Sequence, residues 1–114
     1  MQITGKAKEA FEKWYSENFK KPLEWTYDED GKVIQPPSIM RFEILPDPMQ
    51  YGVYVDFFDS VGIQVNVTGW LMFTYSISYG TSNVKRLKGD TYKTRPEART
   101  AAIEKANEIY NERT

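Results

Sequence analysis

The residues of this chain that could do acid–base chemistry or hold a metal are carboxylates in its middle. Asp56 and Asp59 stand three residues apart, so a helix there would place both side chains on one face. With Asp47 or Glu43 they could hold Mg²⁺, or act as a general acid and base. Like-charged pairs are also common on the solvent side of amphipathic helices. We favour that second interpretation, because no signature spacing accompanies the pair.

Histidine and cysteine are absent from all 114 residues. Their absence excludes a Ser-His-Asp triad, a Cys-His pair, a His base near neutral pH and a zinc site of the Cys/His kind. Carboxylate, Lys, Tyr, Ser and Thr chemistry remains, and no motif organises it. We therefore predict no catalytic residue, no metal site and no cofactor.

A second candidate is the basic stretch within residues 84–99. Cations there could contact phosphates while a tyrosine stacks on a base. The residues concerned are Lys85, Arg86, Lys88, Tyr92, Lys93 and Arg95. Arg95 and Arg99 would lie near a helix N-terminus, where positive charge opposes the helix dipole, and this favours an anionic partner. The alternative is a solvated hairpin and helix start, which the isoelectric point of about 5.5 favours, because nucleic-acid binders are usually basic.

The third candidate is surplus aromatic surface. The chain has eight Tyr, six Phe and three Trp, and Tyr and Trp are enriched at protein interfaces. The residues predicted to contribute to a protein-binding patch are Trp14, Trp25, Tyr51, Trp70 and Tyr79. For each one alone, a place in the core or at its rim is the commoner outcome. As a set they leave room for at least one interface, with another protein or with a second copy of the chain.

The elements that must position these residues follow from periodicity and turn chemistry. Apolar residues spaced three and four apart predict three helices, over residues 4–19, 47–61 and 94–110. Alternation of apolar and polar residues predicts strands over 23–27, 63–67 and 71–79, with shorter pieces at 32–34 and 84–87. Turn residues separate these segments, at 28–31, 68–69, 80–83 and 88–90.

The middle helix has the clearest end signals. Asp47 predicts the N-cap, Pro48 the first helical position and Gln50 the N3 partner in a capping box. Gly62 predicts the terminator. Because Val and Tyr favour strands, a strand over 52–58 is the competing interpretation.

The element order α-β(β)-α-β-β-(β)-α predicts one α+β domain over residues 1–114, with three helices and an antiparallel sheet of three to five strands. Thr94 and Glu97 predict a capping box for the last helix. A charged amphipathic N-terminal segment and the lack of a long apolar run predict no signal peptide and no membrane partner. We expect a cytoplasmic protein.

Two blocks of the sequence carry a family resemblance: LPDPMQYGVYVDFFDSVGI at residues 45–63 and YKTRPEARTAAIEKANEIYN at residues 92–111. They resemble a family of small, uncharacterised proteins found in phages and prophages of gut bacteria. The two blocks make up about a third of the chain. The resemblance implies a setting inside a bacterium or a phage-infected host cell. It implies no activity and assigns no role to any residue.

The sequence therefore predicts a non-enzymatic protein-interaction or binding module, whose partner is an unidentified protein or a second copy of the chain. Nucleic-acid binding through residues 85–99 is the alternative. A carboxylate-based enzyme is the third hypothesis.

Overall fold

The predicted α+β domain is confirmed in a computed structural model, which describes residues 2–18, 26–35, 42, 45–80 and 83–113. Its helices are α1 (Gly5–Asn18), α2 (Asp47–Ser60) and α3 (Arg95–Asn111). Its strands are β1 (Thr26–Tyr27), β2 (Val33–Gln35), β3 (Ile63–Gly69), β4 (Phe73–Tyr79) and β5 (Lys85–Lys88). The competing strand interpretation of residues 52–58 is excluded, because they lie inside α2.

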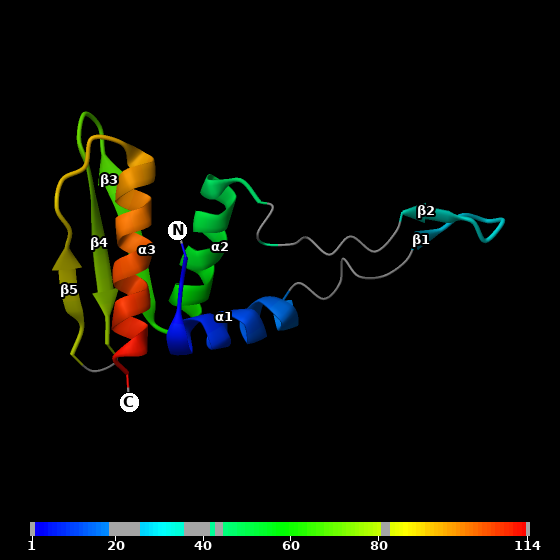
Figure 1. Ribbon diagram of the computed structural model, residues 1–114, viewed down its shortest axis with the longest axis horizontal. Coiled ribbons are helices and arrows are strands. Elements are labelled where there is room, and N and C mark those ends of the chain that lie inside the picture. The colour runs from blue at the N-terminus through cyan, green and yellow to red at the C-terminus, as the bar shows by residue number, and fades with distance from the viewer. Residues whose placement is uncertain (1, 19–25, 36–41, 43–44, 81–82, 114) are drawn as a thin grey trace.

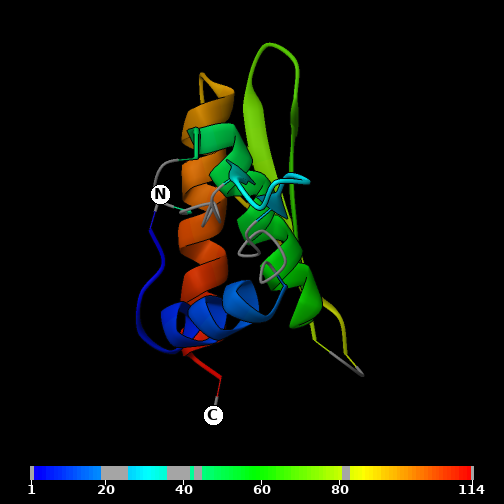
Figure 2. The same ribbon diagram turned by 90° about the vertical axis from the view of Figure 1, so that its right-hand side faces the viewer.

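The main sheet is antiparallel, in the order β3-β4-β5, with α2 and α3 against it and α1 lying across the ends of both helices (Figures 1 and 2). The short pair β1-β2 lies apart from this body in Figure 1. Its turn is the one predicted from sequence, with Gly31 at φ 79° and the carboxylate of Asp28 accepting from the backbone N–H of Lys32 at 2.7 Å. No helix in the described part of the chain has the length and apolar character needed to cross a bilayer.

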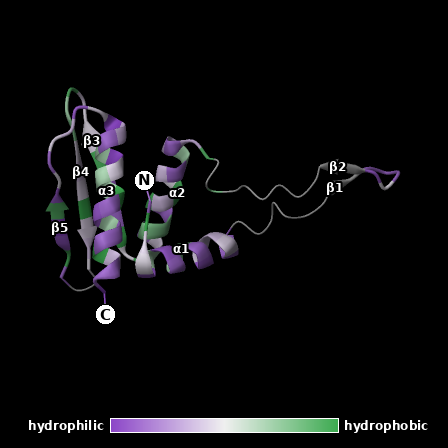
Figure 3. Cartoon of the chain, viewed as in Figure 1, coloured by the Kyte–Doolittle hydropathy of each residue, from purple (hydrophilic) through white to green (hydrophobic). Residues whose placement is uncertain are grey.

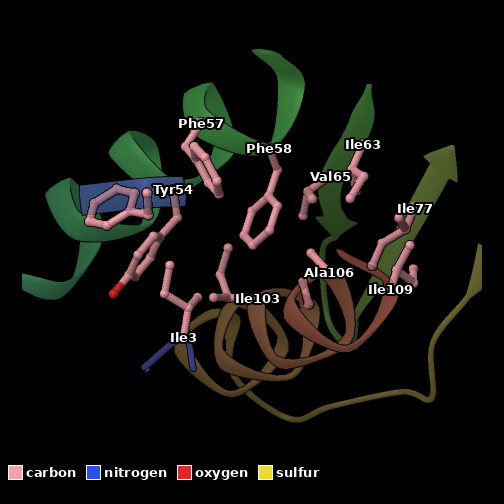
Figure 4. Close-up of a cluster of buried hydrophobic side chains, with 12 residues drawn as sticks. Ile3, Tyr54, Phe57, Phe58, Ile63, Val65, Ile77, Ile103, Ala106 and Ile109 are labelled. Carbon is pink, nitrogen blue, oxygen red and sulfur yellow. The ribbon is translucent and has the colours of Figure 1, made fainter. Parts of the chain in front are cut away.

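The core fills the space between the sheet and the helices (Figure 4). Apolar side chains at alternate positions of the strands meet a helical stripe from α2 and small or branched residues of α3. The contributing residues are Tyr54, Phe57, Phe58, Ile63, Val65, Ile77, Ala102, Ile103, Ala106 and Ile109. Alanines of α3 leave no side chain beyond Cβ, and this lets the helix lie close to β3 and β4.

Helix α1 is tied to the body by rings and by side-chain amides. Phe11 is the centre of the ring contacts, with centroids 4.9 Å from Tyr54 and 5.4 Å from Phe57 of α2. At the start of α1, Asn111 of α3 accepts from the backbone N–H of Ala7 at 2.8 Å. An α3 residue thus satisfies one of the donors that every helix N-terminus leaves without an intrahelical partner.

The capping box predicted at Asp47 is wrong. Helix α2 begins at Asp47 itself, its N-cap is Pro46, and no side chain caps it. Gln50 instead reaches back with its amide group and donates to the backbone carbonyls of Phe42 and Leu45, at 3.2 and 3.0 Å. For α3, the N-cap half of the predicted capping box is confirmed. The Thr94 hydroxyl accepts from the backbone N–H of Glu97 at 3.3 Å.

The strand predicted from residue 71 begins two residues later, at Phe73. The turn is displaced because β3 continues through Gly69, whose φ of 144° suits glycine and whose added Cβ would collide with the carbonyl oxygen of Met72. Trp70, Leu71 and Met72 therefore form the turn. Alternation could not reveal the later start of β4. Leu71 stands two residues before the first residue of the strand and therefore continues its apolar alternation toward the N-terminus.

Candidate functional site

The turn between β3 and β4 carries the two most exposed large apolar side chains of the described residues, and a third exposed one beside them. Trp70 is 87% exposed, Leu71 80% and Met72 48%. Figure 3 marks this turn as a hydrophobic tip of the hairpin, and Figures 1 and 2 place it at the same end of the molecule as the starts of α2 and α3. Met49, in the first turn of α2, is also exposed. We call Trp70, Leu71 and Met72 the apolar tip.

Of the predicted patch aromatics that the structure describes, Trp14, Tyr51, Trp70 and Tyr79, Trp70 is the exposed one. Trp14 is half-buried, with its ring centroid 5.7 Å from that of Phe57, and Tyr79 is half-buried against the core. Tyr51 is half-buried on α2, and Trp25 lies outside the described residues. The four described aromatics come from α1, α2, the β3–β4 turn and β4, and three of them pack against the core. Sequence reasoning missed Leu71 and Met72 beside Trp70.

Two arginines at the start of α3 have aromatic partners inside the protein. The guanidinium of Arg95 lies 5.0 Å from the ring centroid of Phe73, and that of Arg99 lies 5.4 Å from the centroid of Tyr51. Cation–π attraction of this kind offsets their unfavourable position near the positive end of the helix dipole. Burial raises the pKa of Tyr51 above its ordinary value of 10.0, and the two arginines oppose that rise.

The remaining cations of the basic stretch are exposed and divide between two places. Lys85, Arg86 and Lys88 lie on the edge strand β5, and Lys93 precedes α3. Within the described residues, the one ion pair is between Lys105 and Glu108, so none of these four cations is neutralised by a described carboxylate within 4 Å.

Tyr92, predicted to stack on a base, is engaged inside the domain. It exchanges two backbone hydrogen bonds with Phe73, at 2.7 and 2.8 Å, and its ring stacks on Tyr75 with centroids 6.4 Å apart. Its ring is half-buried, so the basic stretch does not present an aromatic platform together with its cations.

The face of the sheet opposite the core is polar. Strand register places Arg86 beside Ser78 and Gln64 in one row, and Lys88 beside Ser76 and Asn66 in the next. Because successive strand residues point to opposite faces, these rows lie on the side away from Ile63, Val65 and Ile77. Two cations thus border a surface of amide and hydroxyl groups.

The acidic candidates that the structure describes lie along α2. Asp47, Asp56 and Asp59 are all exposed on α2, and Glu43 lies outside the described residues. Among the residues with described positions, no three Asp or Glu side chains gather as a metal site would require.

An open groove runs between α2 and the edge strand β3, with a volume of about 710 Å³. One wall is the α2 stripe Met49, Gly52, Val53 and Asp56, spaced at three and four residues. The other wall is β3, through residues 65–67. Sequence reasoning missed this groove, since nothing in periodicity tells which flank of an amphipathic helix remains uncovered.

The chain was compared with models of protein families, with curated proteins and with solved structures, and no match was found in any of them. The resemblance to phage and prophage proteins remains a prediction. Geometry alone therefore supports the functional argument.

Proposed function

We propose that this chain is a non-enzymatic protein-interaction module of phage or prophage origin, which acts in the bacterial cytoplasm through its apolar tip. The observation that carries the proposal is the exposure of three consecutive apolar residues, Trp70, Leu71 and Met72. Runs of this kind are unfavourable in water unless a partner covers them. Covering a side chain such as Leu71 contributes about 1.5–3 kcal/mol, and tryptophan is enriched among the residues that dominate binding.

Local structure supports the same conclusion. The conformation of the tip is fixed at both ends. Gly69 precedes it at the start of a tight turn, and the backbone hydrogen bonds between Phe73 and Tyr92 follow it. A rigid presentation lowers the entropy cost of binding.

The test is affinity capture from bacterial lysate with and without nuclease. Wild-type chain is compared with the double variant Trp70→Ser, Leu71→Ser and with Val84→Ser, which removes an exposed apolar residue elsewhere. A stoichiometric protein that survives nuclease, persists with Val84→Ser and disappears with the double variant is the expected result. Equal capture by all three chains would contradict a role for the tip.

A second candidate function is nucleic-acid binding, which the exposed cations Arg86, Lys88 and Lys93 favour, since no carboxylate among the described residues pairs with them. Single-strand binders combine cations with aromatic stacking, but Tyr92 is occupied by Tyr75. The arrangement therefore suits phosphate contacts along a duplex better than stacking on a single strand.

Fluorescence anisotropy of labelled duplex and single-stranded probes, titrated at several salt concentrations, tests this candidate. Three phosphate contacts predict a slope of log K against log salt of about −3 on duplex DNA, because each contact releases counterions. The triple variant Lys85→Glu, Arg86→Glu, Lys88→Glu should abolish binding. Salt-independent binding, or none, would eliminate the candidate.

A further inference from the structure

The two walls of the α2–β3 groove differ in the hydrogen-bonding groups they offer. In β4, the backbone groups of Phe73 and Tyr75 face the β5 side, since they bond to Tyr92 and Gly89. Backbone groups alternate in direction along a strand, so Thr74, Ser76 and Ser78 face β3. Their register partners on β3 are Thr68, Asn66 and Gln64.

It follows that the backbone N–H and C=O groups of Val65 and Val67 point away from β4, toward the open edge of the sheet. Both residues line the groove. Among the described residues, no backbone hydrogen bond from a turn or loop reaches either of them. β3 thus presents donors and acceptors at a strand's spacing beside an apolar trough, which is the geometry of strand addition by an extended peptide.

Gly52 is the second observation. A glycine inside a helix costs about 1 kcal/mol relative to alanine, so it usually has a structural reason. Here a Cβ would meet nothing within 4 Å, and its φ is not in the left-handed region. The space that the missing side chain leaves opens into the groove, where a partner's side chain or backbone could approach α2 closely.

Charge indicates the chemistry of the occupant. Asp56 is the charged residue among those that line the groove, and residues 45–80 contain Asp47, Asp56 and Asp59 with no Lys or Arg. If β3 of a second copy paired with this β3, the α2 helices of both copies, each with exposed carboxylates, would lie close together. β3 carries no charged residue that could pair with those carboxylates. A basic partner meets no such repulsion.

We propose that the α2–β3 groove binds an extended peptide segment of a partner protein, which adds a strand to β3, places apolar side chains over Gly52 and Val53, and directs a Lys or Arg toward Asp56. This inference rests on the proposed function, because it takes the chain to be a protein-interaction module. It names a surface separate from the apolar tip and the kind of partner that fits it.

The experiment selects octapeptides from a random display library against the immobilised 114-residue chain. Enriched sequences should carry apolar residues and a Lys or Arg at positions two apart, because the side chains that an added strand turns toward α2 stand at every second position. One selected peptide is then titrated into the chain while amide hydrogen exchange is followed. Strand addition predicts new protection at the amides of Val65 and Val67, with little change at Asn66, whose amide already bonds to β4.

Variants separate the groove from the rest of the surface. Gly52→Leu fills the groove and should weaken the selected peptide about tenfold or more, whereas Ser16→Leu on the exposed side of α1 should not. Asp56→Asn should weaken it up to about fivefold, the usual value of an exposed ion pair. Thermal unfolding of each variant confirms that it is folded.

Several outcomes would overturn the inference: no enrichment, enrichment of acidic peptides, equal binding to Gly52→Leu, or no protection at Val65 and Val67. The double variant Trp70→Ser, Leu71→Ser should bind the peptide normally. Loss of partner capture in that variant with intact peptide binding, or the reverse, distinguishes a failure of the apolar tip from a failure of the groove.

Discussion

The two edges of the main sheet are built differently. Strand β5 has four residues, and three of them are the cations Lys85, Arg86 and Lys88. Strand β3 has seven residues, none charged, and a groove lies along it. Charged side chains on a short edge strand discourage pairing with another chain, whereas a long uncharged edge invites it. The comparison indicates that one edge is protected and the other is open for a partner.

The largest effect on stability is expected from a substitution at the last residue of β3. Gly69→Ala should destabilise the fold by about 2–3 kcal/mol, because alanine disfavours a φ of 144° and its Cβ would collide with the Met72 carbonyl. Denaturant unfolding followed by circular dichroism measures the loss. An unchanged midpoint would show that the turn can rearrange, and the open edge would then be poorly defined.

Gly52→Ala should raise the free energy of unfolding, whereas Gly69→Ala should lower it. The substitution adds a Cβ in open space within a helix, so we expect stabilisation of about 1 kcal/mol together with weaker binding of the selected peptide. Denaturant unfolding and a binding titration of the same preparation check both parts. A more stable chain that binds equally well would separate the glycine from the groove's function.

Removing the charges of β5 tests whether they prevent this edge from pairing with another chain. In Lys85→Thr, Arg86→Thr, Lys88→Thr, β5 becomes an uncharged edge, and we expect concentration-dependent self-association in sedimentation velocity with an unchanged fold. A matched variant, Lys6→Gln, Lys8→Gln, Lys13→Gln on α1, alters the net charge equally and should stay as the parent. Association of both variants would assign the effect to net charge instead of the edge.

The smallest effect concerns alkaline pH. Burial raises the pKa values of Tyr51 and Tyr75 above 10.0 in the folded chain. The unfolded chain therefore loses these protons first as pH rises, and stability should fall slightly from about pH 10 upward. Tyr51→Phe keeps the ring beneath Arg99 and should reduce that fall. Unfolding midpoints at pH 9 and pH 11 test this, and an identical fall in the variant would exclude Tyr51 as a source.

Much of the architecture could be predicted because periodic burial dominates local choices. Tyr54, Phe57 and Phe58 lie at helical spacing, and they overrode the strand preference of their neighbours. Ile63 and Val65 gave the strand pattern of β3 for the same reason. Thr94 and Glu97 located the start of α3, since a hydroxyl N-cap acts within four residues of sequence.

What could not be predicted depends on contacts between distant segments. Arg99 meets Tyr51 across two helices, so its position at a helix start looked unfavourable from sequence alone. Gln50 bonds to Phe42 and Leu45, which replaced the expected capping box. Leu71 fits the period of β4 and nevertheless lies in the turn, because β3 runs two residues past the predicted strand end, through Gly69.

Amide hydrogen exchange, with and without a selected basic peptide, tests the contrast between the edges most directly. The outward amides belong to Val65 and Val67 on β3, and to Arg86 and Lys88 on β5, whereas Asn66 and Leu87 bond within the sheet. We expect all four outward amides to exchange quickly in the free chain, and the peptide to protect only Val65 and Val67. Protection at Arg86 and Lys88, or at none of the four, would contradict the assignment of β3 as the open edge.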